Sequence, residues 1–315
     1  MRAAVLDDYQ NCALSLADWS RISTDVDVTV FNRPFEGVDD AARALEPFEI
    51  VCAMRERTAI GRDLLSRLPN LKLLVTTGLR NAAIDLDAAR DLGVMVCGTQ
   101  VRGHATAELT WALILGLARH LPVEVANMRS GGWQTTVGCD LRGKTLGVIG
   151  LGRLGSQVAK IGRAFGMEVV AWSQNLTPER AGEVGVPAVS KDELFARSDV
   201  ITVHLVLGDR TRGLVGEPEF AKMKPTASLI NTSRGPIVDT TALIAALQAG
   251  RIAGAGIDVY DHEPLPADHP LRSCPNALLT PHIGYVTEET YRVFYGQTVD
   301  AIAAYLAGDP IRVLT

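Results

Sequence analysis

The sequence predicts an α/β protein with two doubly wound parallel-sheet domains. Strand-like and helix-like segments alternate from residue 3 to residue 97, and a second alternation begins at Lys144. Such alternation is typical of βαβ units, whose strands pair in parallel. The length of 315 residues fits about two domains of roughly 150 residues each.

In the first alternation, short apolar runs predict strands and longer amphipathic runs predict helices. The predicted strands are residues 3–6, 26–31, 49–54, 71–76 and 94–97, and the predicted helices are residues 38–45, 60–68 and 86–92. A run rich in Ala, Leu and Trp then predicts a long helix over residues 106–121 that ends at Pro122. This change of pattern places a domain crossing near residue 100.

The second alternation is longer and ends in a terminal helix. The predicted strands are residues 145–149, 168–172, 199–205, 228–231, 256–259 and 278–280, and the predicted helices are residues 155–165, 192–197, 240–249 and 287–306. Gly250 directly follows the predicted helix 240–249, which is the usual position of a C-terminal glycine stop.

Composition and charge exclude several classes of protein. Apolar residues make up 47% of the chain and charged residues 21%, which excludes a disordered chain, a collagen-like repeat and a disulfide miniprotein. The 31 basic and 36 acidic residues give a net charge of −5, which argues against a dedicated nucleic-acid binder. Five widely spaced cysteines without a C-x-x-C motif favour buried free thiols.

The N-terminus and the hydropathy pattern predict a cytoplasmic protein without membrane contact. Asp7 and Asp8 occur too early for a signal peptide. The apolar stretches are well short of the roughly 18 residues that a bilayer-spanning helix needs.

A strand, a glycine turn and the start of a helix follow one another in residues 146–155. The G-x-G-x-x-G motif consists of Gly150, Gly152 and Gly155. Gly150 permits the tight turn, Gly152 lets the backbone approach a pyrophosphate, and Gly155 lets the helix pack closely on the strand. The free N–H groups at the start of the helix favour phosphate. This context predicts that the larger domain is a Rossmann dinucleotide-binding domain.

The residues after the second strand of this domain leave the choice between NAD and NADP open. An NAD-selective site places Asp or Glu about 20 residues after the turn. This chain has Ser173 there, followed by Gln174 and Asn175, and neutral groups do not repel a 2′-phosphate. Arg180 follows, and it either reaches such a phosphate or is an ordinary exposed helix residue.

Three C-terminal segments carry polar residues directly after predicted strands. They are residues 231–235, 256–264 and 280–284. Because ligands of open parallel sheets bind beyond the carboxyl ends of the strands, we expect all three on the side of the Gly150 turn. In these segments, Arg234 supplies a cation that can bind the carboxylate and carbonyl of a ligand. Glu263 supplies an orienting carboxylate, and His282 supplies a proton donor. Reduction of a 2-keto acid by hydride transfer needs these three groups.

Together, these motifs resemble those of the D-isomer-specific 2-hydroxyacid dehydrogenase family over essentially the whole chain. The matching segments are residues 150–155, 203–205, 231–238, 258–264 and 280–284. The resemblance implies an NAD(P)-dependent oxidoreductase that transfers hydride between the cofactor and a 2-keto acid or D-2-hydroxy acid. It implies that Arg234 binds the substrate carboxylate and carbonyl, that Glu263 pairs with the catalytic histidine, and that His282 donates the proton.

The resemblance and the glycine motif also give an expected set of cofactor contacts, with Asp258 on the nicotinamide carboxamide. The set is Gly150, Gly152, Arg153, Leu154, Gly155, Ser173, Thr232, Ser233, Asp258 and Gly284. His204 either borders the cofactor or only ends a strand. The remaining histidines, including His262 beside Glu263, are expected to be non-catalytic, and no metal site is expected.

The substrate loop departs from the family pattern. Many relatives carry G-x-G-x-D-x-I-D, whose backbone amides hold the substrate carboxylate, whereas this chain keeps Gly78 and Asp85 but has Arg80 at the second glycine. We hypothesise that Gly78, Leu79 and Arg80 line the substrate pocket and that Arg80 adds a cation for a larger or dianionic acid. The alternative is that Arg80 points to solvent. Arg55, after another predicted strand, is a weaker candidate.

From these motifs we expect a discontinuous domain arrangement. Residues 1–100 and 286–315 are expected to form the substrate-binding domain, and residues 101–285 the dinucleotide-binding domain. The expected partner is a small 2-keto or 2-hydroxy acid. The resemblance also implies a homodimer formed through helices of the cofactor domain, and the helix 106–121 fits either that interface or an internal core.

Two other functions are compatible with the same scaffold. A formate dehydrogenase would carry Gln where this chain has Glu263, so the acid argues against that function. A non-enzymatic NAD(H)-sensing protein, similar to the C-terminal-binding co-repressors, would keep similar motifs. It would also need a peptide-binding surface in the N-terminal domain, which the sequence does not identify.

Overall fold

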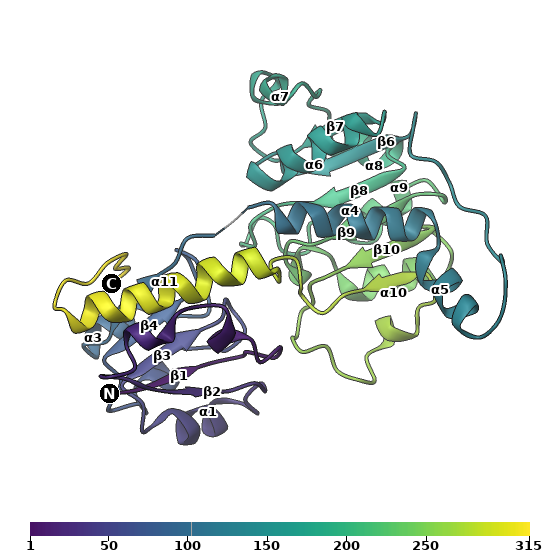
Figure 1. Ribbon diagram of the computed structural model, residues 1–315. Coiled ribbons are helices and arrows are strands. Elements are labelled where there is room, and N and C mark those ends of the chain that lie inside the picture. The colour runs from purple at the N-terminus through teal and green to yellow at the C-terminus, as the bar shows by residue number, and fades with distance from the viewer. Residues whose placement is uncertain (102) are drawn as a thin grey trace. The chain divides into compact units, whose positions relative to one another are not determined.

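The computed structural model describes residues 1–101 and 103–315, and the chain divides into two compact units (Figure 1). Unit 1 consists of Met1–Arg102 and Val286–Thr315, and unit 2 of Gly103–Tyr285. Unit 1 contains a 5-stranded sheet and unit 2 a 6-stranded sheet, and every strand pairing in both is parallel. The predicted α/β class with two parallel sheets is confirmed.

In unit 1, the strand order is β2-β1-β3-β4-β5. The elements are β1 (Arg2–Val5), η1 (Ala13–Ser15), η2 (Trp19–Arg21), β2 (Asp27–Val30), α1 (Val38–Leu45), β3 (Ile50–Ala53), α2 (Arg62–Leu65), β4 (Leu73–Thr76), α3 (Leu86–Asp91), β5 (Met95–Gly98) and α11 (Glu288–Leu306). Leu45, Leu64 and Ala88 from α1, α2 and α3 join Leu74 of β4 in one buried cluster. Helix α11 lies along β4 and β5 with Phe294 fully buried (Figure 1). The central strands are therefore covered on both faces, which explains their unbroken apolar sequences.

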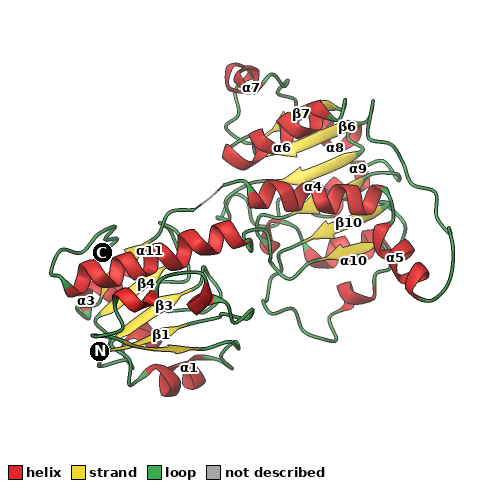
Figure 2. Cartoon of the chain, in the orientation of Figure 1, coloured by secondary structure: helices red, strands yellow, loops and turns green. Residues whose placement is uncertain are grey.

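In unit 2, the strand order is β11-β10-β9-β8-β6-β7. Figure 2 shows the alternation of its strands and helices. The elements are α4 (Ala105–Ala118), α5 (Leu121–Arg129), β6 (Thr145–Ile149), α6 (Arg153–Ala164), β7 (Glu168–Trp172), α7 (Pro178–Val184), α8 (Lys191–Arg197), β8 (Val200–Val203), α9 (Glu217–Lys222), β9 (Ser228–Asn231), η3 (Gly235–Ile237), α10 (Thr240–Gln248), β10 (Gly254–Ile257), η4 (Pro270–Ser273) and β11 (Ala277–Leu279).

Successive side chains of β6 enter two separate cores, as expected of a strand with a helix layer on each face. Val148 joins Trp111 of α4 and Val158 of α6 in one cluster. Ile149 joins a second cluster with Phe195 of α8 and residues of α9 and α10. One face of helix α4, with Trp111, Leu113 and Ile114, therefore packs in the core of unit 2.

Three helices of unit 2 differ from the prediction because each has a proline in its first turn. Helix α5 contains Pro122, α7 begins at Pro178 and α9 contains Pro218. Proline lacks an N–H group, but the first turn of a helix needs none, so a helix can begin there. The prediction treated Pro122 as the end of a helix, whereas α4 ends at Ala118 and α5 begins at Leu121 after a left-handed residue at His120.

Strand β10 begins two residues earlier than predicted because glycines occupy its first half. A Cβ atom at Gly254 would lie 2.8 Å from the carbonyl oxygen of Asn276, and one at Gly256 would lie 3.0 Å from Cβ of Leu113 in α4. The glycines thus permit α4 to approach the sheet closely. The strand ends at Ile257, which leaves Asp258 as the first residue beyond it.

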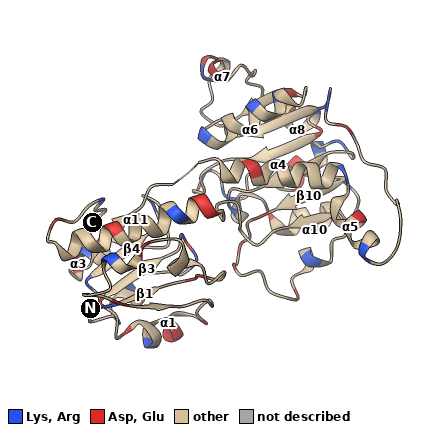
Figure 3. Cartoon of the chain, viewed as in Figure 1, with Lys and Arg blue, Asp and Glu red and all other residues tan. Residues whose placement is uncertain are grey.

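Charged residues of both signs are interspersed over the helices and loops of each unit (Figure 3). Across residues 1–101 and 103–315, no single helix is both long and apolar enough to cross a membrane. Helices α4 and α5 meet that criterion of length and composition only as a pair, and they are bent by 67° at their junction.

The buried cluster of unit 1 predicts a large difference between two otherwise identical substitutions. Leu74 is 0% exposed and Leu92 is 45% exposed. Leu74→Ala should lower the free energy of unfolding by about 2–5 kcal/mol because it removes apolar contacts and leaves a cavity. Leu92→Ala should change it by less than about 0.5 kcal/mol. Urea unfolding followed by circular dichroism measures both, and equal losses would contradict this assignment of the core.

Candidate active site

The carboxyl ends of five strands in unit 2 lie level with one another. Ile149 pairs with Val203, Val203 with Asn231, Asn231 with Ile257, and Ile257 with Leu279. The loops that follow these strands therefore emerge at one edge of the sheet, which we call the carboxyl edge. The glycine turn and all three predicted polar segments begin at this edge.

The glycine turn between β6 and α6 has the geometry of a phosphate cradle. Gly150 has φ +95°, and a Cβ atom there would lie 2.5 Å from the carbonyl oxygen of His204. A Cβ atom at Gly155 would lie only 1.9 Å from the carbonyl oxygen of Gly150. At Gly152, in contrast, a Cβ atom would meet nothing within 4 Å, and the residue provides no side-chain cap for α6. Open space beside an uncapped helix N-terminus fits the pyrophosphate of a dinucleotide.

Other predicted cofactor residues surround this turn. Arg153 is exposed in the first turn of α6, and Leu154 is half-buried. Ser173 is half-buried after β7, at the start of a turn in which its carbonyl accepts a hydrogen bond from the N–H of Leu176. Arg180 is exposed and pairs with Glu183 on the same helix.

His204 connects β8 with the glycine turn. Its Nε2 atom lies 2.8 Å from Thr202 Oγ1, and its backbone N–H donates to the carbonyl of Ile149 at 2.7 Å. Burial lowers the pKa of His204 to about 4, so the ring is neutral at pH 7. Because its carbonyl lies against Gly150, the residue contributes to the close packing of the turn.

The loop after β9 is fixed by the side chain of Asn231, which is buried. Its Oδ1 accepts a hydrogen bond from the N–H of Ser233 at 3.0 Å, and its Nδ2 donates to the carbonyl of Arg234 at 2.9 Å. The hydroxyl of Thr232 lies 2.8 Å from the hydroxyl of Thr110 in α4. These contacts hold the loop in one conformation and leave the Arg234 guanidinium half-buried, with Nη1 donating to the Ser233 carbonyl.

Gly235 brings this loop against the segment that carries Glu263. A Cβ atom at Gly235 would lie 2.2 Å from the carbonyl carbon of Tyr260, so any other residue would separate the two backbones. The hydroxyl of Tyr260 donates to the carbonyl of Thr280 at 2.8 Å, which ties the same segment to the loop after β11. Three loops are therefore joined through one tyrosine and one glycine.

Glu263 and His282 form the central pair of the site. His282 Nδ1 lies 2.5 Å from Glu263 Oε2, and Glu263 Oε1 accepts a hydrogen bond from the N–H of Tyr260 at 2.9 Å. Burial by itself raises the pKa of Glu263. The hydrogen bond and charge of His282 lower it, as do the Tyr260 N–H and the charge of Arg234, and together these effects exceed that of burial. The net result is a lowered pKa, so this carboxyl group is ionised at neutral pH.

Asp258 holds the loop that carries His282. The side chain is fully buried, with Oδ1 accepting from the Thr280 hydroxyl at 2.6 Å and the Ile283 N–H at 2.8 Å. Its Oδ2 accepts from the Gly284 N–H at 2.9 Å. Burial raises the pKa of Asp258, and these hydrogen bonds oppose that rise. His282 itself has φ +53°, a left-handed conformation that few non-glycine residues adopt.

Two supporting residues of the site were not predicted from the sequence. The Thr106 hydroxyl donates to the Gly284 carbonyl at 2.9 Å, and the Thr110 hydroxyl contacts that of Thr232. Both threonines lie near the start of α4, in a run that resembles an ordinary core helix. The sequence contains no signal that distinguishes them from structural threonines.

The predicted substrate residues lie in unit 1, after β4. Gly78 is buried with φ +98°, and its N–H donates to the Thr99 hydroxyl at 2.9 Å. Leu79 and Arg80 are exposed. Arg55 lies against Gly78, where a Cβ atom would come within 2.0 Å of the guanidinium.

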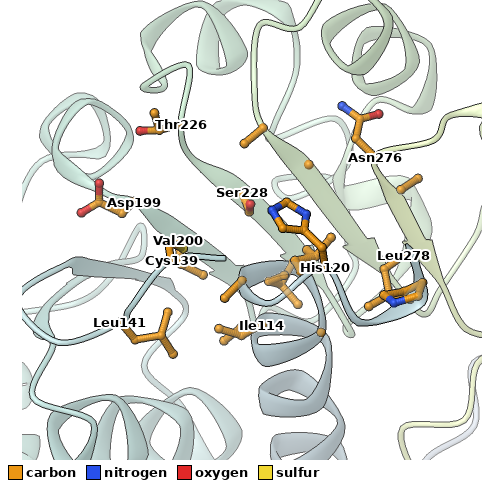
Figure 4. Close-up of a pocket in the computed structure, with 18 of the residues that line it drawn as sticks. Ile114, His120, Cys139, Leu141, Asp199, Val200, Thr226, Ser228, Asn276 and Leu278 are labelled. Atoms are coloured by element: carbon orange, nitrogen blue, oxygen red, sulfur yellow. The ribbon is translucent and has the colours of Figure 1, made fainter. Parts of the chain in front are cut away.

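A separate cavity of about 440 Å³ lies at the opposite, amino edge of the unit 2 sheet (Figure 4). Its lining includes Ile114 and His120 near the end of α4, Cys139 before β6, and Ser228 at the start of β9. None of the predicted site residues lines it. Among the described residues, no cluster of three or more His, Cys, Asp or Glu side chains is arranged to hold a metal ion.

Comparisons with known proteins identify the family of this chain. Residues 111–284 match the family model described as "D-isomer specific 2-hydroxyacid dehydrogenase, NAD binding domain". The chain is 39% identical to the glyoxylate reductase of Aeropyrum pernix over 296 residues, which cover 90% of this chain and 87% of that protein. It is 38% identical to the D-3-phosphoglycerate dehydrogenase of Bacillus subtilis over 280 residues, covering 88% of this chain and 53% of that protein. The chain thus spans about half the length of this second relative.

Solved structures show the same fold. A phosphoglycerate oxidoreductase from Vibrio cholerae O395 superposes with a TM-score of 0.93 and 38% identity, covering 98% of this chain and 99% of the other. An acyclic imino acid reductase, Bsp5, was solved with NADPH and D-Arg. It superposes with a TM-score of 0.76 and 27% identity over 100% of both chains. This chain therefore belongs to the NAD(P)-dependent D-isomer-specific 2-hydroxyacid dehydrogenase family.

Proposed function

We propose that this chain reduces a small 2-keto acid to the corresponding D-2-hydroxy acid, with His282 as the proton donor. The observation that carries the proposal is the 2.5 Å contact between His282 Nδ1 and Glu263 Oε2 at the carboxyl edge of unit 2. The loop with Arg234 packs against the segment with Glu263, so a cation, a proton donor and an orienting carboxylate occur together.

Arg234 binds the substrate carboxylate and polarises the keto group. A guanidinium can make two parallel hydrogen bonds to a carboxylate, which fixes the plane of the acid as well as its charge. The Asn231 contacts to Ser233 and Arg234 fix the backbone of this loop before substrate binds. Such preorganisation lowers the entropic cost of reaching the transition state.

His282 supplies the proton through Nε2, because Nδ1 is held by Glu263. As the keto oxygen gains negative charge, the imidazolium gives it a proton, and in the oxidative direction the neutral ring takes that proton back. Glu263 is ionised because its pKa is lowered, so it stabilises the imidazolium and fixes the ring orientation. The two residues together form the acid–base group of the proposed reaction.

The proposed cofactor is NAD or NADP, held by the glycine turn with Arg153 and Leu154, by Ser173, and by the loops with Thr232, Ser233, Asp258 and Gly284. The bound reduced cofactor supplies the hydride. Asp258 orders the Ile283 and Gly284 backbone in the protein itself, so its part in cofactor binding includes shaping the loop. The neutral turn at Ser173 accommodates either dinucleotide.

For the residues of unit 1, we propose that Gly78, Leu79 and Arg80 contact the substrate. The relatives are named for glyoxylate and for D-3-phosphoglycerate, so the substrate class is a short 2-keto acid in which the group on the keto carbon varies, from hydrogen to a substituted carbon. Assays of NADH and NADPH oxidation with glyoxylate, pyruvate and hydroxypyruvate test the function as a whole.

Replacing His282 should separate catalysis from folding. His282→Asn removes the proton donor, and kcat should fall by about 10²–10⁴-fold. The matched control is His262→Asn, because His262 is exposed and lies beside Glu263 without being assigned a role. Steady-state kinetics with the best acid of the panel measure both variants. Full kcat in His282→Asn, or an equal loss in His262→Asn, would exclude the assignment.

Two glycine substitutions distinguish cofactor contact from structural packing. Gly152→Ala meets no neighbouring atom, so the variant should fold normally but bind NAD(P)H roughly 10-fold more weakly, because the methyl group occupies the phosphate position. Gly155→Ala should instead destabilise the protein, because its Cβ would collide with the Gly150 carbonyl. Fluorescence titration and thermal unfolding report the two effects. Unchanged affinity in Gly152→Ala would argue against a cofactor phosphate at this turn.

We further propose that the chain forms a homodimer through α5 and the segment that follows it. No residue of α5 is buried, although five of its nine residues are apolar. The exposed apolar residues of this region are Leu121, Val123, Val125, Met128, Trp133 and Val137. Large exposed apolar residues gathered on one helix and the segment after it are typical of an interface between subunits.

Sedimentation velocity tests this interface. Val125→Asp combined with Met128→Asp should convert a dimer into a monomer, because it places two charges in an apolar contact. Leu14→Asp provides the control, since Leu14 is also about half exposed but lies in unit 1. A wild-type monomer, or a double variant that remains dimeric, would contradict the proposed interface.

A further inference from the structure

Tyr260 is the third residue beyond β10, at the carboxyl edge of unit 2. Its half-buried ring packs against the core cluster that contains Ile149 and Ile237. The next residue is anchored as well, because Asp261 Oδ2 accepts a hydrogen bond from the Thr240 hydroxyl at the start of α10 at 2.7 Å. Packing and this hydrogen bond therefore fix the segment on the sheet.

The hydroxyl of Tyr260 holds the loop that carries His282. It donates to the Thr280 carbonyl at 2.8 Å and lies 3.1 Å from the carbonyl of Ile257. The Thr280 carbonyl also accepts a hydrogen bond from the His282 N–H at 3.1 Å. This second bond closes the tight turn in which His282 has φ +53°. The tyrosine hydroxyl thus binds the same carbonyl that fixes the His282 backbone.

The other member of the acid–base pair contacts the backbone of the same tyrosine. The Tyr260 N–H donates to Glu263 Oε1 at 2.9 Å, and Oε2 of that carboxylate lies 2.5 Å from His282 Nδ1. Tyr260 therefore binds Glu263 through its backbone and the loop of His282 through its hydroxyl. A single residue thus connects both partners of the contact on which the proposed acid–base chemistry depends.

The Tyr260 hydroxyl is suited to hold this contact and not to transfer a proton. Burial raises the pKa of Tyr260, and the charges of Asp258 and Glu263 raise it further. The hydroxyl therefore stays protonated and remains a hydrogen-bond donor at the pH of an assay. Its proton is directed at two backbone carbonyls.

We propose that Tyr260 is a positioning residue that sets the contact between Glu263 and His282, and with it the ring nitrogen of His282 that carries the proton. The inference rests on the proposed function, in which His282 acts through Nε2. A contact of Nδ1 with the Glu263 carboxylate keeps the proton of the neutral ring on Nδ1, so Nε2 is free to accept a proton from a hydroxy acid. The Tyr260 hydroxyl maintains this tautomer because it holds the loop of His282 within hydrogen-bond distance of Glu263.

Nitrogen NMR of isotope-labelled histidine rings tests the proposal without any need for turnover. The signals of His282 are those that disappear in His282→Asn. At alkaline pH, wild type should carry the proton of the neutral His282 ring on Nδ1. Tyr260→Phe removes only the hydroxyl, and it should shift part of the population to the tautomer with the proton on Nε2. The same tautomer population in both proteins would overturn the proposal.

Steady-state kinetics test the same role in the reaction. Tyr260→Phe should lower kcat by about 3- to 10-fold, as expected for one lost hydrogen bond, and should leave KM for the acid unchanged because Arg234 is not altered. In a His282→Asn background the same substitution should have little further effect on kcat, because its effect passes through His282. A full further loss in the double variant would show a general structural role and would overturn the proposal.

The matched control is Tyr305→Phe, which removes the hydroxyl of a half-buried tyrosine of α11 in unit 1. It should change neither the tautomer of His282 nor kcat, and losses equal to those of Tyr260→Phe would contradict a specific role of Tyr260. Thermal unfolding checks that both variants are folded. Failure of wild type to reduce any acid would refute the proposed function, and the tautomer measurement would then decide the role of Tyr260 on its own.

Discussion

The candidate active site depends on the buried carboxylate of Asp258. Removing a carboxylate from water costs several kcal/mol unless hydrogen bonds replace its hydration. Here three donors from Thr280, Ile283 and Gly284 offset part of this cost, and all three belong to the loop that carries His282. The same contacts hold His282 at φ +53°, a conformation that costs energy outside glycine. The orientation of His282 is therefore determined indirectly, by the Asp258 side chain, which binds the residues on either side of His282.

Close backbone packing completes the arrangement. The collision that a side chain at Gly235 would make with Tyr260, and the one that a side chain at Gly155 would make with Gly150, show two places where only glycine fits. In both, the consequence is that a functional group reaches its position: Arg234 near Glu263, and the N-terminus of α6 beside the turn. The positions of the polar groups at the carboxyl edge thus depend on backbone contacts so close that a methyl group at Gly155 or Gly235 would not fit.

Much of this could be predicted from the sequence because the informative features are local. Alternating patterns identify parallel strands, and a polar residue directly after a strand must lie at the carboxyl edge, so Arg234, Glu263 and His282 could be assigned to one region. The family follows from the same motifs. Helices α5, α7 and α9 were not predicted because proline disrupts the interior of a helix but is favoured in its first turn, and the sequence does not distinguish the two positions.

Other features depend on contacts between distant segments and had no sequence signal. The hydrogen bonds of Thr106 and Thr110 and the packing of α4 against β10 involve partners far along the chain. The ion pair of Arg55 with its neighbour Glu56 depends instead on which rotamers the two side chains adopt. The exposed surface of α5 is a further example, because Leu121, Val125 and Met128 have the spacing of a core-facing stripe, and the sequence does not show that they are exposed. Selectivity between NAD and NADP is undetermined for a related reason, since Ser173 excludes neither dinucleotide.

The division of the chain also constrains the order in which it can fold. Unit 2 is one continuous segment, whereas unit 1 needs both the first 102 residues and the segment Val286–Thr315. Helix α11 supplies Phe294, Val299 and Ile302 to the core of unit 1, so one face of its sheet stays uncovered until residues 288–306 have been synthesised. We therefore expect the apolar strands of unit 1 to remain exposed during translation while unit 2 is synthesised. Such a chain has a greater need of chaperone protection early in its synthesis than a tandem arrangement of the same two units would have.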